Sequence, residues 1–162
     1  MGDSAGGGLA VALMAQLGAQ DVAPRAAGLM SPWLDLTATA LSRGVDDPFI
    51  SEGDLKARAR LYAAGRDPTD PRLSPLLGEL KGLPPMIVHV GSREVLLNDA
   101  ARFARAANAA GSFVELEVWD RMTHVWHQWG AALPAAGIAT TSLAERVVEL
   151  AGWTNVRSET AP

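Results

Sequence analysis

The feature that most constrains this chain is the pattern Gly-x-Ser-x-Gly, which occupies residues 2–6 and runs straight into an apolar stretch. A serine between closely spaced glycines is typical of a sharp turn from a strand into a helix, where the serine adopts a strained backbone conformation. We expect a Cβ at either Gly2 or Gly6 to collide with this turn. The pattern predicts a helix over residues 4–18, whose N-terminal N–H groups and partial positive charge face Ser4.

Strands and helices are predicted to alternate after this turn. Short apolar runs with β-branched residues predict strands, and apolar residues at helical spacing predict helices. The predicted strands are 26–30, 86–91 and 113–119, and the further predicted helices are 51–65, 98–110 (capped by Asn98) and 141–151. The alternation favours a single α/β domain over residues 1–162 with a mostly parallel sheet. The strand 113–119 alternates apolar and polar residues, which is typical of a half-buried edge strand.

Five stretches, in the order expected, resemble the hormone-sensitive-lipase family of α/β-hydrolase esterases (bacterial family IV). They are GDSAGGGL at 2–9, SPWLDLT at 31–37, DPTDPRLSPL at 67–76, LPPMIVHVGSREVLLND at 83–99 and MTHVWH at 122–127. The resemblance implies a serine carboxylesterase that hydrolyses short-acyl esters through a Ser-His-Glu triad and an acyl-enzyme intermediate. The family's cap, N-terminal strands and HGGG motif are not in this sequence. We therefore expect a partial α/β-hydrolase fold, truncated at the nucleophile turn, with about three mostly parallel strands and flanking helices.

Three histidines are candidates for the base that takes the proton of Ser4, without which a serine hydroxyl is a weak nucleophile. His124 lies in the loop after the last strand, and the order serine, acid, histidine is that of α/β hydrolases. His89 lies inside an apolar strand and is interpreted as a core residue. His127 is interpreted as the start of a structural turn. The sequence therefore favours His124 as the base.

The acid is either Glu94 or Asp99, since both follow the strand 86–91. The family's usual pattern is an aspartate followed by Pro-Leu, and Glu94 occupies that slot here. Family members with a variant loop can use glutamate, and Glu94 precedes His124 by 124 − 94 = 30 positions, a separation common in the family. Glu94 is therefore favoured, to accept a hydrogen bond from Nδ1–H of the imidazole and stabilise the imidazolium. Asp99 has an alternative reading as an acid that complements a helix dipole.

The backbone N–H of Ala5, directly after the nucleophile, is the predicted oxyanion-hole donor. The family's other donors come from the HGGG motif, and the glycines at 6–8 lie inside the predicted helix instead. Losing one such donor typically lowers kcat by ~10²–10³. Asp3 is interpreted as a charge at the helix N-terminus, and Trp33 and Asp35 as structural residues beside the site.

Composition excludes several other functions. A net charge of −4 gives no basic face for nucleic acid, and the chain has no cysteine for disulfides or thiolate metal sites. Three histidines without an H-x-x-x-H spacing predict no metal centre, and no cofactor is expected. Three tryptophans at 119, 126 and 129 are interpreted as packing residues. No apolar run approaches the roughly 18 residues of a membrane span, and no signal peptide is evident, so a cytoplasmic protein is expected.

The expected partners are a small-molecule ester and a second copy of the chain. An unpaired edge on the strand 26–30, and the edge strand 113–119, both favour association into a homo-oligomer. The alternative function is a catalytically impaired fragment that acts only as a folded assembly or interaction module.

Overall fold

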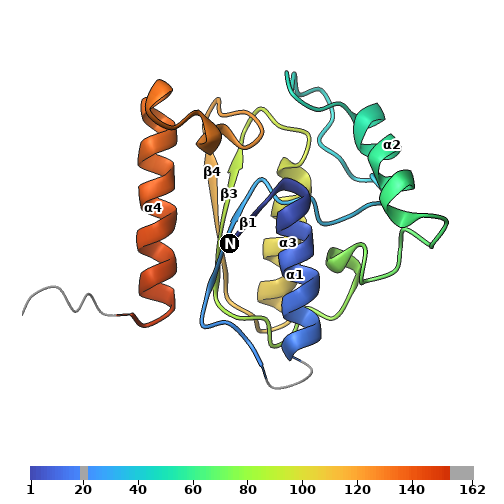
Figure 1. The fold of residues 1–162 in the computed structure, drawn as a ribbon, viewed down its shortest axis with the longest axis horizontal. Coiled ribbons are helices and arrows are strands. Elements are labelled where there is room, and N and C mark those ends of the chain that lie inside the picture. The colour runs from blue at the N-terminus through green and yellow to red at the C-terminus, as the bar shows by residue number, and fades with distance from the viewer. Residues whose placement is uncertain (19–21, 154–162) are drawn as a thin grey trace, which may run out of the picture.

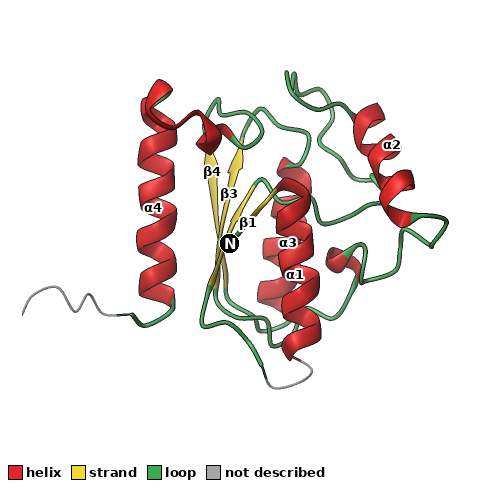
Figure 2. Cartoon of the chain, in the orientation of Figure 1, coloured by secondary structure: helices red, strands yellow, loops and turns green. Residues whose placement is uncertain are grey.

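The computed structural model describes residues 1–18 and 22–153, which form a parallel sheet flanked by helices (Figures 1 and 2). Four strands lie side by side in chain order: β1 Gly2–Asp3, β2 Ala27–Met30, β3 Met86–Gly91 and β4 Val114–Trp119. Every neighbouring pair is parallel. The partial α/β-hydrolase fold is confirmed, with one strand more than the roughly three that the sequence suggested.

The additional strand is β1, the two residues that precede Ser4. Gly2 lies opposite Leu29 and Asp3 opposite Met30 in the sheet. The prediction of an unpaired edge along the strand 26–30 is therefore wrong at its C-terminal end, because β1 covers it. In the described part of the chain, the outer strands are β1 and β4.

Helices cover both faces of the sheet (Figure 1). α1 Ser4–Gly18 and α3 Leu97–Ala109 lie on one face, and α4 Pro134–Leu150 lies on the other. The largest apolar cluster lies between the sheet and the first two of these helices, and its fully buried members include Val11, Leu29, Leu34, Met86, Val88, Val90 and Phe103. On the opposite face α4 lies close to β2: a Cβ at Gly28 would lie only 2.9 Å from Cγ2 of Val147.

α2 Glu52–Ala63 stands apart from the sheet and has a small core of its own (Figure 1). It begins with a capping box, in which the Ser51 hydroxyl accepts from the Asp54 N–H and the Asp54 carboxylate accepts from the Ser51 N–H. The buried residues of this second cluster are Trp33, Leu36, Ala38, Leu41, Leu55, Ala59, Ala63, Leu73, Val95 and Leu96. The cluster joins α2 to the segment after β2 and to the turn after β3.

Two helix starts differ from the sequence prediction. Asn98 does not cap α3, whose N-cap is Leu96; its side-chain amide donates instead to the carbonyl of Ala40 at 2.6 Å. α4 begins at Pro134, seven residues before the predicted start at 141, because proline suits the first turn of a helix and small residues continue it. Short 3₁₀ helices occupy Pro75–Leu77 (η1) and Trp126–Ala132 (η2).

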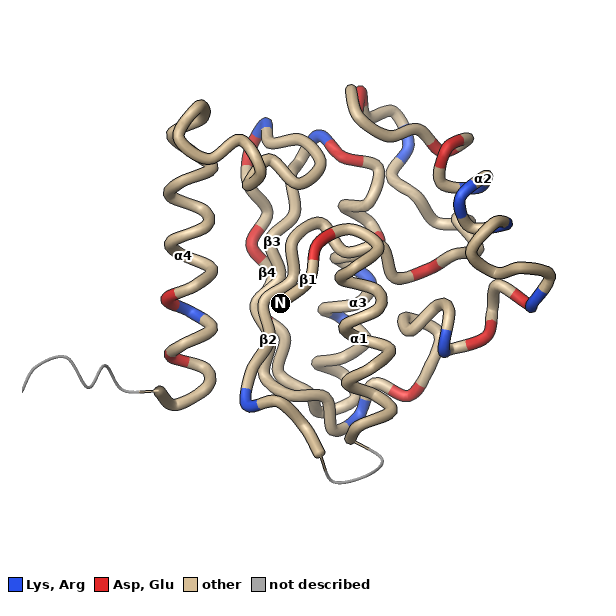
Figure 3. The backbone as a smooth tube through the Cα atoms, in the orientation of Figure 1, with Lys and Arg blue, Asp and Glu red and all other residues tan. Residues whose placement is uncertain are grey.

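Charged residues of both signs are interspersed along the chain (Figure 3). α1 carries none, and its Leu9 and Leu13 are 53% and 55% exposed. Within the two described ranges, no helix is long and apolar enough to cross a membrane.

Candidate active site

Ser4 lies at the turn between β1 and α1, with a left-handed backbone φ of 49°. A Cβ at Gly2 would lie 2.5 Å from the carbonyl oxygen of Gly6, so the first glycine is sterically required. The same expectation for Gly6 is wrong, because the nearest atom to a Cβ there is Oδ1 of Asp3 at 3.7 Å, an ordinary contact. The turn therefore requires glycine at residue 2, and its left-handed backbone conformation is at Ser4.

The structure brings Ser4, His124 and Glu94 together, with the His124 ring between the Ser4 hydroxyl and the Glu94 carboxylate. His124 Nε2 lies 2.9 Å from Ser4 Oγ, and His124 Nδ1 lies 3.0 Å from Glu94 Oε2. Glu94 is fully buried and His124 is 8% exposed. The three residues follow β1, β3 and β4, whose carboxyl ends meet at one edge of the parallel sheet. This arrangement allows a proton to pass from the hydroxyl to the imidazole while the carboxylate fixes the tautomer.

The Glu94 carboxylate is held by two further hydrogen bonds besides its contact with His124. Its Oε1 atom accepts hydrogen bonds from the backbone N–H of Gly91 and from the Ser31 hydroxyl, the latter at 2.9 Å. A Cβ at Gly91 would lie 2.2 Å from the Met122 carbonyl oxygen, so this glycine lets the loop before His124 approach β3. The carboxylate thus has one oxygen bound to the scaffold and the other facing His124.

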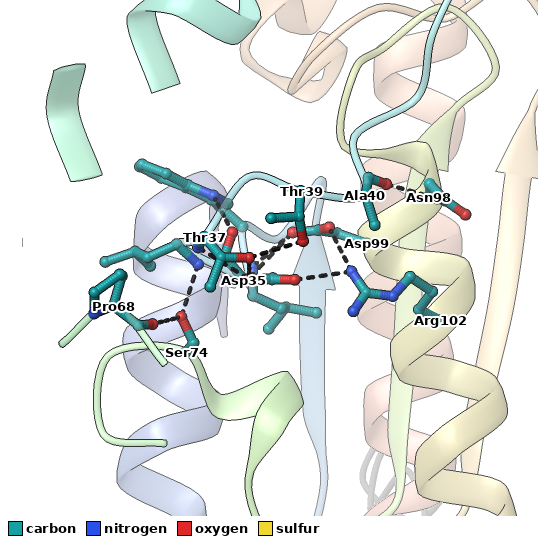
Figure 4. A network of polar contacts seen from close by, with 12 residues as sticks. Asp35, Thr37, Thr39, Ala40, Pro68, Ser74, Asn98, Asp99 and Arg102 are labelled. Atoms are coloured by element: carbon teal, nitrogen blue, oxygen red, sulfur yellow. Dashed lines mark hydrogen bonds and ion pairs between the residues drawn. The ribbon is translucent and has the colours of Figure 1, made fainter. Parts of the chain in front are cut away.

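Asp99, the alternative acid, belongs to a separate network of polar contacts with Asp35 and Arg102 (Figure 4). Its Oδ2 atom accepts from the backbone N–H groups of Leu34 and Asp35 at 3.3 and 3.2 Å, and its Oδ1 lies 3.6 Å from Arg102. Burial, aided by the nearby Asp35 carboxylate, raises the pKa of Asp99 to about 7, although the Leu34 N–H and the Arg102 guanidinium oppose this rise. Asp99 anchors the segment after β2.

Asp35 belongs to the same buried network. Its carboxylate accepts from the Thr37 N–H at 2.9 Å and pairs with Arg102 at 2.9 Å (Figure 4). The Ser74 hydroxyl extends the network by accepting from the Leu36 N–H at 2.7 Å. Asp35 is therefore structural, as the sequence suggested, and the network fixes the segment that carries Trp33 past the N-terminus of α1.

His89 and His127 form a second, separate histidine pair. His89 Nδ1 lies 3.2 Å from His127 Nε2. The His89 ring stacks with the rings of His127 and Trp126, and the His127 ring contacts Trp126 at a tilt. His89 Nε2 lies 3.1 Å from Glu117 Oε2 without the alignment of a hydrogen bond. Desolvation lowers the pKa of both histidines to about 4, so both are neutral at pH 7. The core position of His89 is as the sequence indicated.

We expect the Asp99 carboxyl to give the free energy of unfolding a pH dependence of defined sign. Its folded pKa of about 7 exceeds the unfolded value of about 3.9, so the folded state retains the proton longer and stability falls as the pH rises through this window. The depressed pKa values of His89 and His127 act oppositely, because their contribution is lost as the pH falls from about 6.5 to about 4. Asp99→Asn removes only the first effect.

Between about pH 5 and about pH 7.5, the wild-type protein should therefore lose about 2 kcal/mol of unfolding free energy relative to Asp99→Asn. Urea titrations at several pH values measure it. The histidines are common to both proteins and cancel in the comparison. A difference that stays constant with pH would contradict the protonated state of Asp99.

Ala5 lies at the N-terminus of α1, where backbone N–H groups lack partners within the helix. A cavity of about 210 Å³ opens beside it and is lined by Ala5, Gly8, Leu9, Trp33, Leu36, Arg58, Tyr62, Arg72 and Leu73. Larger hollows of about 440 and 490 Å³ lie along other parts of α1 and α2, and Ser4, Ala5 and His124 do not line them. Among the described residues, no group of three His, Asp or Glu side chains could hold a metal ion.

Comparison with known proteins agrees with this fold. Residues 1–128 match the family described as an alpha/beta hydrolase fold. An acetyl-hydrolase from Streptomyces hygroscopicus is 43% identical over 155 residues, which cover 93% of this chain and 49% of the relative. A crystal structure of an esterase from the bacterial hormone-sensitive lipase family superposes with a TM-score of 0.88 at 39% identity, over 93% of this chain and 52% of that one.

A third match is the structure of the esterase EstE5 soaked by p-nitrophenyl butyrate, with a TM-score of 0.85 and 37% identity over 93% of this chain and 52% of that chain. The chain belongs to the α/β-hydrolase family, and it is similar to esterases of the bacterial hormone-sensitive lipase family. It spans about half the length of these relatives.

Sequence reasoning missed Ser31 and Arg102. Ser31 contacts Glu94, and Arg102 pairs with Asp35, over separations of 94 − 31 = 63 and 102 − 35 = 67 positions. Ser31 lies in the SPWLDLT stretch directly after a predicted strand, and that position was the available signal. No local pattern in the sequence identifies the partner of either residue.

Proposed function

We propose that this chain hydrolyses short-acyl carboxylic esters, with Ser4 as nucleophile, His124 as base and Glu94 as the acid that orients it. Ser4 Oγ attacks the ester carbonyl carbon while its proton passes to His124 Nε2. The alkoxide that leaves takes this proton, and the acyl group remains on Ser4. Water, deprotonated by His124, then attacks the acyl-enzyme, releases the carboxylic acid and restores Ser4.

The observation that carries the proposal is the continuous contact from Ser4 Oγ through His124 to Glu94, at 2.9 and 3.0 Å. The imidazole has one nitrogen on the hydroxyl and the other on a buried carboxylate, as general-base activation of a serine requires. The Ala5 N–H is the proposed donor to the oxyanion, because it follows the nucleophile at the N-terminus of α1.

The proposed substrate class is supported by the cavity of about 210 Å³ beside Ala5. Apolar side chains such as Leu9 and Leu73 line it, so it suits a small apolar group bonded to the carbonyl. The soak of EstE5 with p-nitrophenyl butyrate, a short aryl ester, makes that compound the natural first substrate to test.

Covalent labelling tests the proposal directly. A fluorophosphonate should modify the 162-residue chain once, at Ser4, and p-nitrophenyl butyrate should be hydrolysed by the unlabelled protein only. Intact-protein and peptide mass spectrometry measure the site. His124→Ala should abolish labelling, whereas His127→Asn should not, since His127 contacts His89 instead. A folded chain that is neither labelled nor active would favour the alternative of an assembly or interaction module.

Two further parts of the proposal concern the protein's surroundings. The outer strand β4 exposes Phe113 beside it and Val118 within it, at 49% and 51%, which supports association of two copies along this edge. The homo-oligomer stays a prediction that light scattering can measure. A cytoplasmic location likewise stays a prediction from the sequence.

A further inference from the structure

The Ser31 hydroxyl lies between the proposed acid and the segment that carries the proposed base. Ser31 follows β2 and is fully buried. Its Oγ donates to Glu94 Oε1 at 2.9 Å and accepts from the Val125 backbone N–H at 3.1 Å. Val125 is the residue directly after His124. One hydroxyl therefore bonds simultaneously to two of the three segments from which the site is built.

The backbone is strained at both residues of the Val125 N–H to Ser31 hydroxyl hydrogen bond. Ser31 and Val125 each have a left-handed φ of 47°, which is uncommon for residues with a Cβ and most unfavourable for β-branched valine. Such conformations persist only where the surroundings hold them. The Ser31 N–H donates to the His89 carbonyl at 2.8 Å, which fixes Ser31 to β3, and Ser31 in turn holds Val125.

We propose that Ser31 is a positioning residue for the reaction, which orients the Glu94 carboxylate and holds the turn that places His124 against Ser4. This inference rests on the proposed function. Without the hydroxyl, Glu94 Oε1 keeps only the Gly91 N–H, and the buried Val125 N–H loses its acceptor. The orientation of the carboxylate is then fixed by one hydrogen bond fewer, and the left-handed turn after His124 loses a contact that opposes its relaxation.

Two substitutions separate positioning from a merely structural role. Ser31→Ala removes the hydroxyl and keeps the backbone strain, whereas Ser31→Gly removes the hydroxyl and relieves the strain, since glycine adopts positive φ readily. We expect both variants to lower kcat for p-nitrophenyl butyrate about 10- to 100-fold with KM changed less than threefold, because the loss is confined to orientation of the reacting groups. If Ser31 served only the fold, the glycine variant would keep wild-type kcat.

Ser112→Ala is the matched control. The Ser112 hydroxyl is also buried and also bonds on both sides, accepting from the Leu83 N–H at 3.0 Å and donating to the Leu80 carbonyl at 2.7 Å. It lies just before β4, at the opposite end of the sheet from His124. The control should lose stability but retain kcat. A wild-type kcat in Ser31→Gly, or an equal loss of kcat in Ser112→Ala, would overturn the proposal.

Proton NMR keeps this test independent of turnover. The Nδ1–H of His124, bonded to Glu94, should give a low-field resonance in wild type that shifts or broadens in both Ser31 variants and stays in Ser112→Ala. A wild-type chain that folds but does not hydrolyse esters would count against the proposed function. An unchanged low-field resonance in both Ser31 variants would count against the positioning role.

Discussion

Glu94→Gln is expected to lower kcat for ester hydrolysis about 10⁴-fold, the loss produced by the corresponding acid-to-amide change in a serine protease. The reason lies in the partners of Oε1. That position accepts from the Gly91 N–H and the Ser31 hydroxyl, so the carbonyl oxygen of the glutamine must remain there. Its NH₂ group then faces His124 Nδ1 and requires that nitrogen to be unprotonated. The proton moves to Nε2, which can no longer accept one from Ser4.

Asp99→Asn is the matched comparison for this experiment, since it makes the same chemical change in the other acid considered. Asp99 binds the backbone of Leu34 and Asp35, and the asparagine oxygen can keep these two bonds. Steady-state kinetics with p-nitrophenyl butyrate should show a far smaller loss of kcat than in Glu94→Gln. The reverse ranking of the two variants would show that the acid is misassigned.

Gly8→Ala is expected to destabilise the fold by about 3 kcal/mol or more. A Cβ at Gly8 would lie 2.2 Å from the backbone carbonyl oxygen of Trp33, closer than any real contact. A side-chain rotation cannot relieve the clash, because the Trp33 oxygen is a backbone atom. The backbone around it is also held in place, since the Trp33 N–H is bonded to the Ser4 carbonyl at 2.9 Å and the Leu34 N–H to the Asp99 carboxylate. Either α1 or the segment after β2 must move.

Gly6→Ala provides the control within the same helix. A Cβ there meets only Oδ1 of Asp3 at 3.7 Å, and alanine is a better helix former than glycine by up to about 1 kcal/mol. Urea unfolding should therefore place Gly6→Ala at or above wild type and Gly8→Ala well below it. Equal stability of the two variants would mean that the segment carrying Trp33 yields more readily than its hydrogen bonds indicate.

The parts of the fold that depend on local pattern could be predicted from the sequence. The β-branched run 86–91 and the apolar face of the helix beginning near residue 98 appear where expected, because burial of a continuous face leaves a clear periodicity. β1 was underestimated because two residues are too short to show a period. The start of α4 was placed late because its first residues are small and form no apolar stripe, although Pro134 is a recognised start signal.

The candidate site was predictable only in part. Ser4 and His124 follow strand ends in a recognisable order, and the structure places them in contact. Glu94 and Asp99 are only five positions apart, and the choice between them depends on which side chain points toward His124. No periodicity in the sequence encodes that direction. The only local signal for Ser31 is its position directly after a predicted strand, and that position does not reveal its contacts with Glu94 and Val125, which form when three separate segments come together.

The all-parallel order of the strands has a consequence for how the molecule folds. Paired residues are separated by 29 − 2 = 27, 86 − 27 = 59 and 114 − 86 = 28 positions, so no two strands are joined by a hairpin and each pairing must close a long loop. Such non-local topologies fold slowly. Ser4, Glu94 and His124 meet only when the last of these loops has closed, so regain of this contact during refolding marks completion of the sheet.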